Sequence, residues 1–104
     1  MLANLTIDAN LIHKALASPF RREVLTWLKT SHNAFVQERT DFRYGVPSSA
    51  IHARSGLSQS TVSVHVATLI EAGLVVPTRL GQWTFLSRNE DVIRAFARQI
   101  SLEL

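Results

Sequence analysis

The chain has 104 residues, a mass of 11.6 kDa and a formal net charge of +3, which is the size of one domain with a mildly basic surface. It is 46% hydrophobic and 18% charged, as folded proteins are, and it has no apolar run near the ~20 residues that a membrane span needs. The absence of cysteine excludes disulfide bonds and thiolate metal sites, and no phosphate loop or nucleophile elbow indicates catalysis. We therefore expect a cytoplasmic protein that is not an enzyme and needs no cofactor.

The first 30 residues predict two helices. Apolar side chains recur every three or four residues over 7–17, which is the period of an amphipathic helix. Ser18 and Pro19 then have the residue types of a helix N-cap and a first helical turn, where the missing proline N–H costs nothing. Helical spacing continues to about Thr30, so a second helix follows the first almost directly.

The segment 31–46 shows neither a helical nor a strand period, and it is long for a connection in so small a domain. Its aromatic residues Phe35, Phe42 and Tyr44 are interleaved with arginines. These rings could pad the core, as aromatic side chains usually do, or they could line a pocket for an effector. The sequence leaves both interpretations open.

Residues 47–72 have the pattern of a helix-turn-helix. A short helix is expected from Pro47 to about Gly56, a glycine placed where helices commonly end. Ser58 is a suitable N-cap for a longer helix that stops at Gly73. Two helices separated by a tight turn that contains glycine are typical of this motif.

After this motif the period changes from helical to extended. Two short runs over 74–87 meet at Gly81 and Gln82, which predicts a β hairpin, and Pro77 favours an edge position for its first strand. A last amphipathic helix is expected over 91–103. The chain is thus predicted to be a single domain over 1–104, mainly α with a small β hairpin, in the order α-α-α-α-β-β-α.

The longer helix of the motif has two contrasting faces. Val62, Val66 and Leu69 fall on one side and predict the buried face. Ser60 and Val64 fall on the opposite side together with Ala67, and Ser63 flanks them. This outer face is small and uncharged, so it could enter a DNA major groove, where serine and glutamine bond base edges and valine packs on a thymine methyl. It could instead face another protein, which is the alternative function.

The basic residues support the DNA interpretation. No acid occurs between Asp41 and Glu71, which suits contact with a polyanion. Arg79 precedes the expected hairpin turn and Arg54 lies near the end of the shorter helix, so each could contact a phosphate or be an ordinary surface residue. The residues predicted to contact DNA are Gln59, Ser60, Thr61, Ser63, Val64, His65, Arg54, Arg79 and Gln82.

Three segments resemble the ArsR-type winged helix-turn-helix repressors of bacteria. ALASPFRREVLTWL is similar to the family's opening LADPTRLxIL, and GLSQSTVSVHVATLIEAGLV to its recognition segment GLSQPTVSRHLKVLREAGLV. GQWTFLS is similar to its wing return. The resemblance covers roughly residues 9–104 apart from 31–45, and its recognition segment is the most specific part.

The resemblance implies a winged helix-turn-helix with the wing at 74–87 and a homodimer built on the first and last helices, 7–17 and 91–103. It also implies a repressor that leaves a palindromic double-stranded operator when an effector binds. Among the DNA-reading positions of the family, Val64 stands where arginine is common. His65 lies toward the buried flank, so it is either a phosphate contact or a half-buried structural histidine.

Many members of this family sense metals, and this sequence departs from them at the ligand positions. Their thiolate pair would fall within 47–54, which offers only His52, and no histidine follows His65 toward the last helix. The histidines are scattered, whereas a transition-metal site needs three or four converging ligands. We therefore expect no metal site, and an effector, if there is one, that is not a metal.

Overall fold

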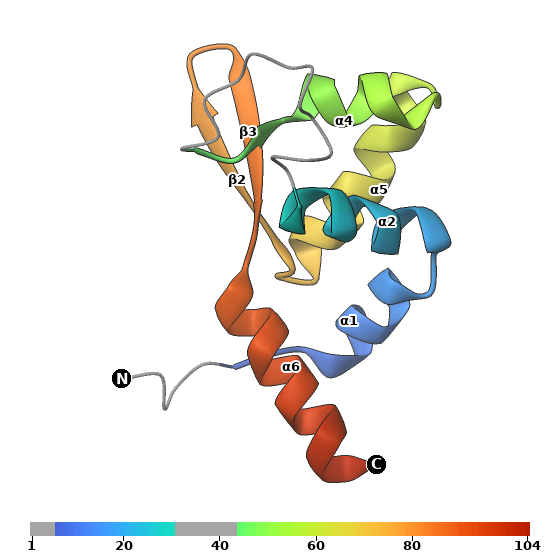
Figure 1. The fold of residues 1–104 in the computed structure, drawn as a ribbon, viewed down its shortest axis with the longest axis vertical. Helices are drawn as coiled ribbons and strands as arrows, with labels where there is room; N and C mark the ends of the chain where they lie inside the picture. The colour runs from blue at the N-terminus through green and yellow to red at the C-terminus, as the bar shows by residue number, and fades with distance from the viewer. Residues whose placement is uncertain (1–5, 31–43) are drawn as a thin grey trace.

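The computed structural model describes residues 6–30 and 44–104, which form five helices and a three-stranded antiparallel sheet (Figure 1). The elements in chain order are α1 (Ala9–Leu16), α2 (Pro19–Lys29), β1 (Val46–Pro47), α4 (Ser48–Ser55), α5 (Gln59–Glu71), β2 (Val75–Leu80), β3 (Trp83–Arg88) and α6 (Glu90–Glu103). The mainly helical fold with a β hairpin is confirmed, and α4 and α5 form the predicted helix-turn-helix. Among the described residues no helix has both the length and the apolar character required to cross a bilayer.

Four helices begin at side chains that accept a hydrogen bond from the first turn. Ser18 accepts from the backbone N–H of Arg21 at 3.3 Å, and Ser58 accepts from that of Thr61 at 3.2 Å, as the sequence predicts. Asp8 and Asn89 cap α1 and α6 in the same way. Because each cap satisfies an otherwise unpaired helix N–H, these residues fix where the helices start.

The sheet has the strand order β1-β3-β2. The predicted hairpin is present, and Pro77 lies in the edge strand β2, where its missing N–H breaks no ladder. The third strand was not predicted: Pro47 does not begin the helix α4 but lies in β1, opposite Phe85 of β3. A strand of two residues has no detectable period, so its pairing depends on contacts that only the folded chain makes.

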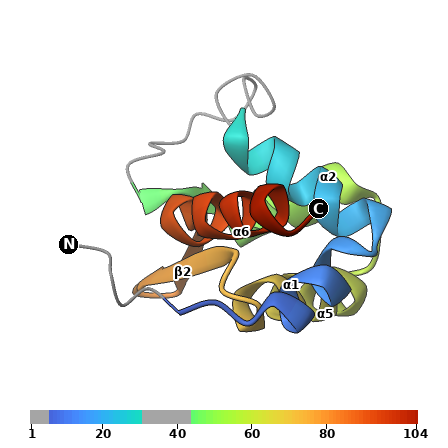
Figure 2. The same ribbon diagram turned by 90° about the horizontal axis from the view of Figure 1, so that it is seen from below.

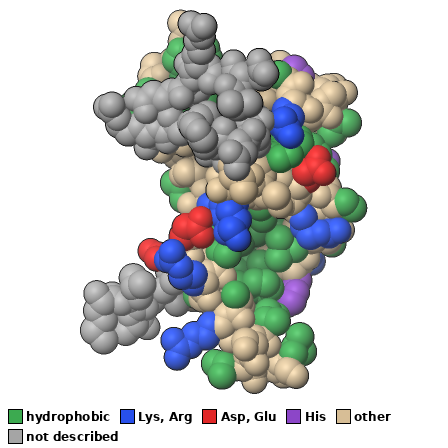
Figure 3. All heavy atoms as spheres, in the orientation of Figure 1, with side chains coloured by type: hydrophobic (Ala, Val, Ile, Leu, Met, Phe, Trp, Pro, Cys, Tyr) green, Lys and Arg blue, Asp and Glu red, His purple; other side chains and the backbone are tan. Residues whose placement is uncertain are grey.

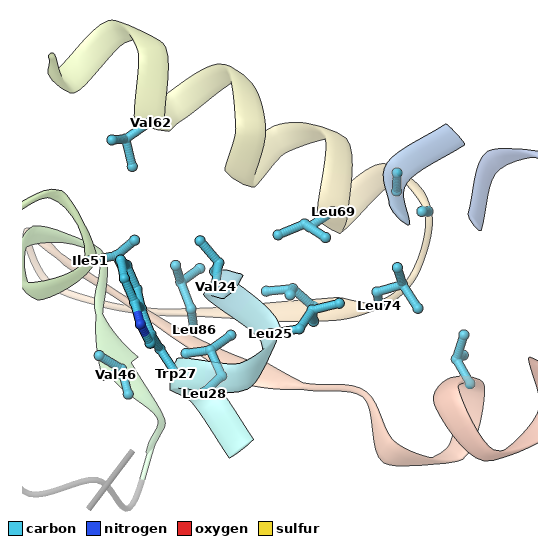
Figure 4. Packing of buried hydrophobic residues seen from close by; sticks show 14 of the residues in the cluster. Val24, Leu25, Trp27, Leu28, Val46, Ile51, Val62, Leu69, Leu74 and Leu86 are labelled. Atoms are coloured by element: carbon cyan, nitrogen blue, oxygen red, sulfur yellow. The ribbon is translucent and has the colours of Figure 1, made fainter. Parts of the chain in front are cut away.

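The core lies between the helices and one face of the sheet. Its most deeply buried side chains come from four helices, from β1 and β3, and from the residue that precedes β2. They are Ile12, Val24, Val46, Ile51, Leu69, Leu74 and Leu86. Figure 4 shows the side chains of α2, α4 and α5 and those of the strands pointing toward one another. Every buried side-chain nitrogen or oxygen in the described part of the chain has a hydrogen-bond partner.

The helices occupy different sides of the molecule. Figure 2 shows α5 and α1 together on one side and α2 on the other. Helix α6 leaves the sheet at the end opposite the hairpin turn (Figure 1). It packs against α1 through the edge-to-face rings of His13 and Phe96, whose centroids are 5.1 Å apart. Its end is open to solvent, since Leu102 and Leu104 are 77% and 98% exposed.

Candidate nucleic-acid interface

Helix α5 is held in place by its apolar face. Val62 is 4% exposed and Leu69 is fully buried, while Val66 is half-buried. These are the three residues that the helical projection assigns to the buried side, so that prediction is confirmed. Burial of this face fixes the opposite face of α5 toward solvent.

The outward face of α5 is small, neutral and open. Ser60, Ser63 and Ala67 are exposed, and Val64 is 66% exposed. No charged residue occurs between Gln59 and Ile70. A helix with such short side chains can approach another surface closely with its backbone, and its hydroxyl groups can donate or accept hydrogen bonds there.

The first turn of α5 is organised by hydroxyl groups. The Ser58 hydroxyl accepts from the backbone N–H of Thr61 and donates to the Thr61 hydroxyl at 2.8 Å. The Ser60 hydroxyl lies 3.3 Å from the same oxygen. Thr61 is therefore oriented by the cap, and its hydroxyl already has one intramolecular partner.

A groove of about 350 Å³ runs beside α5, between this helix, α4 and β3. Its polar lining residues are Ser48, Ser49, His52, Gln59, Ser63 and Thr84. None of the described residues that line it is a carboxylate. Of this set only Gln59 and Ser63 were predicted as site residues. The others were missed because the groove forms from three separate elements, although the acid-free stretch before Glu71 is a signal that points to those in α4.

The hairpin adds a positive charge to the same side as the groove. Arg79 is exposed and pairs directly with Thr84 across the ladder. Because directly paired residues share a face of the sheet, Arg79 lies on the face whose Thr84 lines the groove. Gln82 is exposed in the turn, and the neighbouring Trp83 is 58% exposed.

Arg54 takes a different position from Arg79. It is exposed near the end of α4, and its guanidinium carbon lies 5.0 Å from the centre of the Trp27 ring of α2. This stacking on an aromatic face orients the arginine. Arg54 is not among the residues that line the groove.

His65 is half-buried on the flank of α5, in agreement with the projection. Its Nδ1 atom lies 3.0 Å from an Nη atom of Arg21 in α2, and its ring meets the Phe20 ring edge-on at 5.1 Å. Sequence reasoning identified the half-buried position but not the partner, which lies 44 residues earlier.

The predicted effector pocket is described only in part, because Phe35 and Phe42 lie outside the described residues. Tyr44 is 41% exposed, and its ring centre is 6.0 Å from that of Phe85. It lines a second cavity, of about 390 Å³, between α2, the sheet and the start of α6. Arg88 and Glu90 form an ion pair at its edge, with 2.8 Å between Nε and Oε2.

The charges around Glu90 favour its ionised form. The hydrogen bond from Arg88 lowers the pKa of the Glu90 carboxyl below its ordinary value, and the charges of Arg88, Arg94 and Lys29 act in the same direction. The second cavity thus has an intact ion pair at neutral pH. Within residues 6–30 and 44–104, no group of three or more potential ligands that could hold a metal ion occurs.

Comparison with known proteins adds two sequence matches. A profile of the IclR helix-turn-helix domain matches residues 36–79. The chain is 33% identical over 95 residues to YbzH of Bacillus subtilis (strain 168), which is described as an uncharacterized HTH-type transcriptional regulator. That alignment covers 89% of this chain and 95% of the relative.

Solved structures share the fold. The crystal structure of an ArsR family transcriptional regulator superimposes with a TM-score of 0.69 at 19% identity, over 90% of this chain and 84% of that one. An ArsR-like transcriptional regulator from Rhodococcus sp. RHA1 gives 0.67 at 22% identity, over 89% and 76%. HlyU from Vibrio cholerae N16961 gives 0.61 at 24% identity, over 91% and 90%. These likenesses show the winged-helix fold.

Proposed function

Because this chain belongs to the HTH-type transcriptional regulators and is a DNA-binding protein rather than an enzyme, we propose that it is a homodimeric repressor that binds a palindromic operator. The observation that carries the proposal is the small, neutral, exposed face of α5, which stands beside a groove without carboxylates. Because bacterial chromosomal DNA lies in the cytoplasm, a repressor that binds a chromosomal operator would act there.

Helix α5 is the recognition helix in this proposal and enters the major groove. Gln59, Ser60 and Ser63 would bond base edges, and the exposed Val64 would pack on a thymine methyl group. Thr61, oriented by the cap, would add a contact at the start of the helix. Since α5 lacks arginine and lysine, sequence would be read by hydroxyl and amide groups, and affinity would come mainly from elsewhere.

The phosphate backbone supplies that affinity. We propose that a strand passes along the groove, with Arg79 and Gln82 of the hairpin on one side and the hydroxyls of α4 on the other. Arg54 would contact a phosphate from the end of α4. His65, whose Nδ1 atom is already engaged by Arg21, would reach DNA only through its Nε2 atom.

A second copy of the chain would cover the apolar side of α1 and α6. Leu102 and Leu104 are almost fully exposed at the end of α6, and Ile93 and Phe96 are only partly buried. Figure 3 shows hydrophobic side chains gathered over this lower part of the molecule. A two-fold dimer through these helices would bury them and present two recognition helices to successive turns of DNA.

Release from the operator is proposed to depend on an effector that is not a metal. The proposal is supported by the absence of cysteine from the sequence. The cavity beside Tyr44 touches the hairpin, α2 and the start of α6. A molecule bound there would contact both the wing and the proposed dimerisation helix.

Selection from random duplexes, followed by footprinting at ~150 mM salt, tests the proposed function. We expect enrichment of a palindrome whose half-sites are centred about 10 base pairs apart, with protection of both halves. Binding that shows no preference over random duplex would contradict the proposal, and protection of one half-site alone would contradict the dimer.

Replacing Arg79 by glutamine tests the backbone contact. We expect weaker binding to operator and random duplex alike, and a salt dependence whose log–log slope is smaller by about one per subunit, because one phosphate contact is lost. Fluorescence anisotropy titrations between 50 and 200 mM salt would measure both quantities.

Arg94→Gln is the matched control, since Arg94 is exposed on α6 and pairs with Asp91 at 3.6 Å. It removes the same charge far from the groove, so its slope is expected to stay near that of the wild type. Equal slopes for the two variants would show that Arg79 makes no phosphate contact.

A further inference from the structure

The side chain of Arg21 joins three helices. It starts from the first turn of α2, and its Nε atom donates to the carbonyl oxygen of Ala15 at 2.7 Å. One Nη atom donates to the carbonyl of Lys14 at 3.1 Å, so both bonds end on the last residues of α1. The other Nη atom lies 3.0 Å from Nδ1 of His65, in the middle of α5.

The chemistry of this contact defines the state of the histidine. A guanidinium has only donors, so Nδ1 of His65 must accept, and the proton of the neutral ring then sits on Nε2. The Phe20 ring meets the imidazole edge-on at 5.1 Å and limits its rotation. The carbonyls that receive Arg21 belong to a helix C-terminus, which lacks intrahelical donors and attracts cations.

This geometry sets the position of the recognition helix relative to α1. His65 follows Val64, which is 66% exposed on the outer face, and the same helix carries Ser63 and Ser60. The planar guanidinium of Arg21 is bonded to α1 on one side and to His65 of α5 on the other. It therefore allows little change in the spacing between these two helices. In the proposed dimer through α1 and α6, that spacing also orients each recognition helix toward its own half-site.

We infer that Arg21 is a positioning residue for operator reading, which acts through His65 and not by touching DNA. The inference rests on the proposed function, because it concerns how α5 is presented to the operator. It predicts that loss of either partner lowers discrimination between operator and random duplex, whereas loss of a neighbouring charge does not.

The neighbouring residue provides a matched control. Arg22 is also in the first turn of α2, and its guanidinium also bonds a carbonyl of α1, that of Leu16, but it is exposed and its bond does not lead to α5. Arg22→Met therefore removes the same charge and the same kind of cap as Arg21→Met. Arg21 bonds one more α1 carbonyl than Arg22 does, so the His65 variants are needed to assign a difference between the two to the link with His65.

The experiment measures dissociation constants for operator and random duplex at one salt concentration. We expect Arg21→Met and His65→Leu each to lower the ratio of specific to non-specific affinity about tenfold, the scale of one charge-assisted hydrogen bond. The double variant should be no worse than Arg21→Met alone, because that substitution already removes the contact with His65. His65→Asn should restore most of the ratio, since its amide oxygen can accept from Arg21, and Arg22→Met should keep it.

Equal ratios for Arg21→Met and Arg22→Met, or a His65→Asn variant as defective as His65→Leu, would overturn the inference. A wild-type protein without operator preference would instead overturn the proposed function on which it rests. Nitrogen-15 NMR of the imidazole separates the two cases without DNA: we expect the Nε2–H tautomer in the wild type and a tautomer mixture in Arg21→Met. A wild-type mixture would overturn the inference directly.

Discussion

Replacing Ser60 and Ser63 together by glutamate is expected to abolish operator binding while leaving the fold intact. Both side chains are exposed on the outer face of α5, so the added carboxylates meet the phosphates that line the major groove. Like charges brought together at an interface cost several kcal/mol, which corresponds to a loss of at least about a hundredfold in affinity. Folding should not suffer, since both positions are exposed and a carboxylate at position 60, in the first turn of α5, interacts favourably with the helix dipole.

Mobility shifts on the selected operator measure the loss, and thermal unfolding checks the fold. Thr26→Glu/Thr30→Glu is the matched control, because it adds two carboxylates at exposed positions, one in α2 and one at its C-cap, on the other side of the molecule (Figure 2). Its operator affinity is expected to fall far less. If the Ser60/Ser63 variant kept its affinity for DNA, the outer face of α5 would have to serve contact with another protein instead.

Gly45→Ala is expected to destabilise the protein by more than about 3 kcal/mol, the sum of a strained backbone and a steric clash. The φ angle of Gly45 is +107°, a conformation that residues with a Cβ rarely adopt. A Cβ at this position would lie 2.3 Å from the carbonyl oxygen of Leu86 in β3. The clash falls where Val46 pairs with Leu86, so relief requires β1 to separate from β3.

Urea unfolding of the variant measures the loss of free energy. Gly81→Ala is the control, because its φ is also positive, at +60°, but no atom lies within 4 Å of the added Cβ. We expect that substitution to cost about 1 kcal/mol, the penalty of the left-handed conformation alone. Similar losses for both variants would mean that the close approach of Gly45 to β3 is not required for stability.

Local chemistry explains the parts of the fold that could be predicted from the sequence. Ser18 and Ser58 have the side-chain oxygens that a helix start needs, and both cap as predicted. The spacing of Val62 and Leu69 assigns the two faces of α5, because helical periodicity depends only on positions along the chain. Pro77 is placed in an edge strand by the N–H it lacks.

Contacts between distant segments could not be predicted in this way. Strand β1 is too short to leave a pattern, and Pro47, which is a good helix-start residue, was assigned to the helix instead. The groove beside α5 takes its lining from α4, α5 and β3, which only the folded chain brings together. Arg21 and His65 were separately visible, but nothing local connects two residues 44 positions apart.

The amino-acid sequence alone determined that this chain is a small helix-turn-helix domain with a hairpin, and which side of α5 faces outward. Both follow from periodicity and from capping residues, whose effects extend over one or two helical turns. Only the tertiary structure decided what stands around that helix: the groove, the face on which Arg79 lies and the guanidinium that joins α5 to α1. These depend on how the elements pack, and packing brings together side chains that the linear order keeps apart.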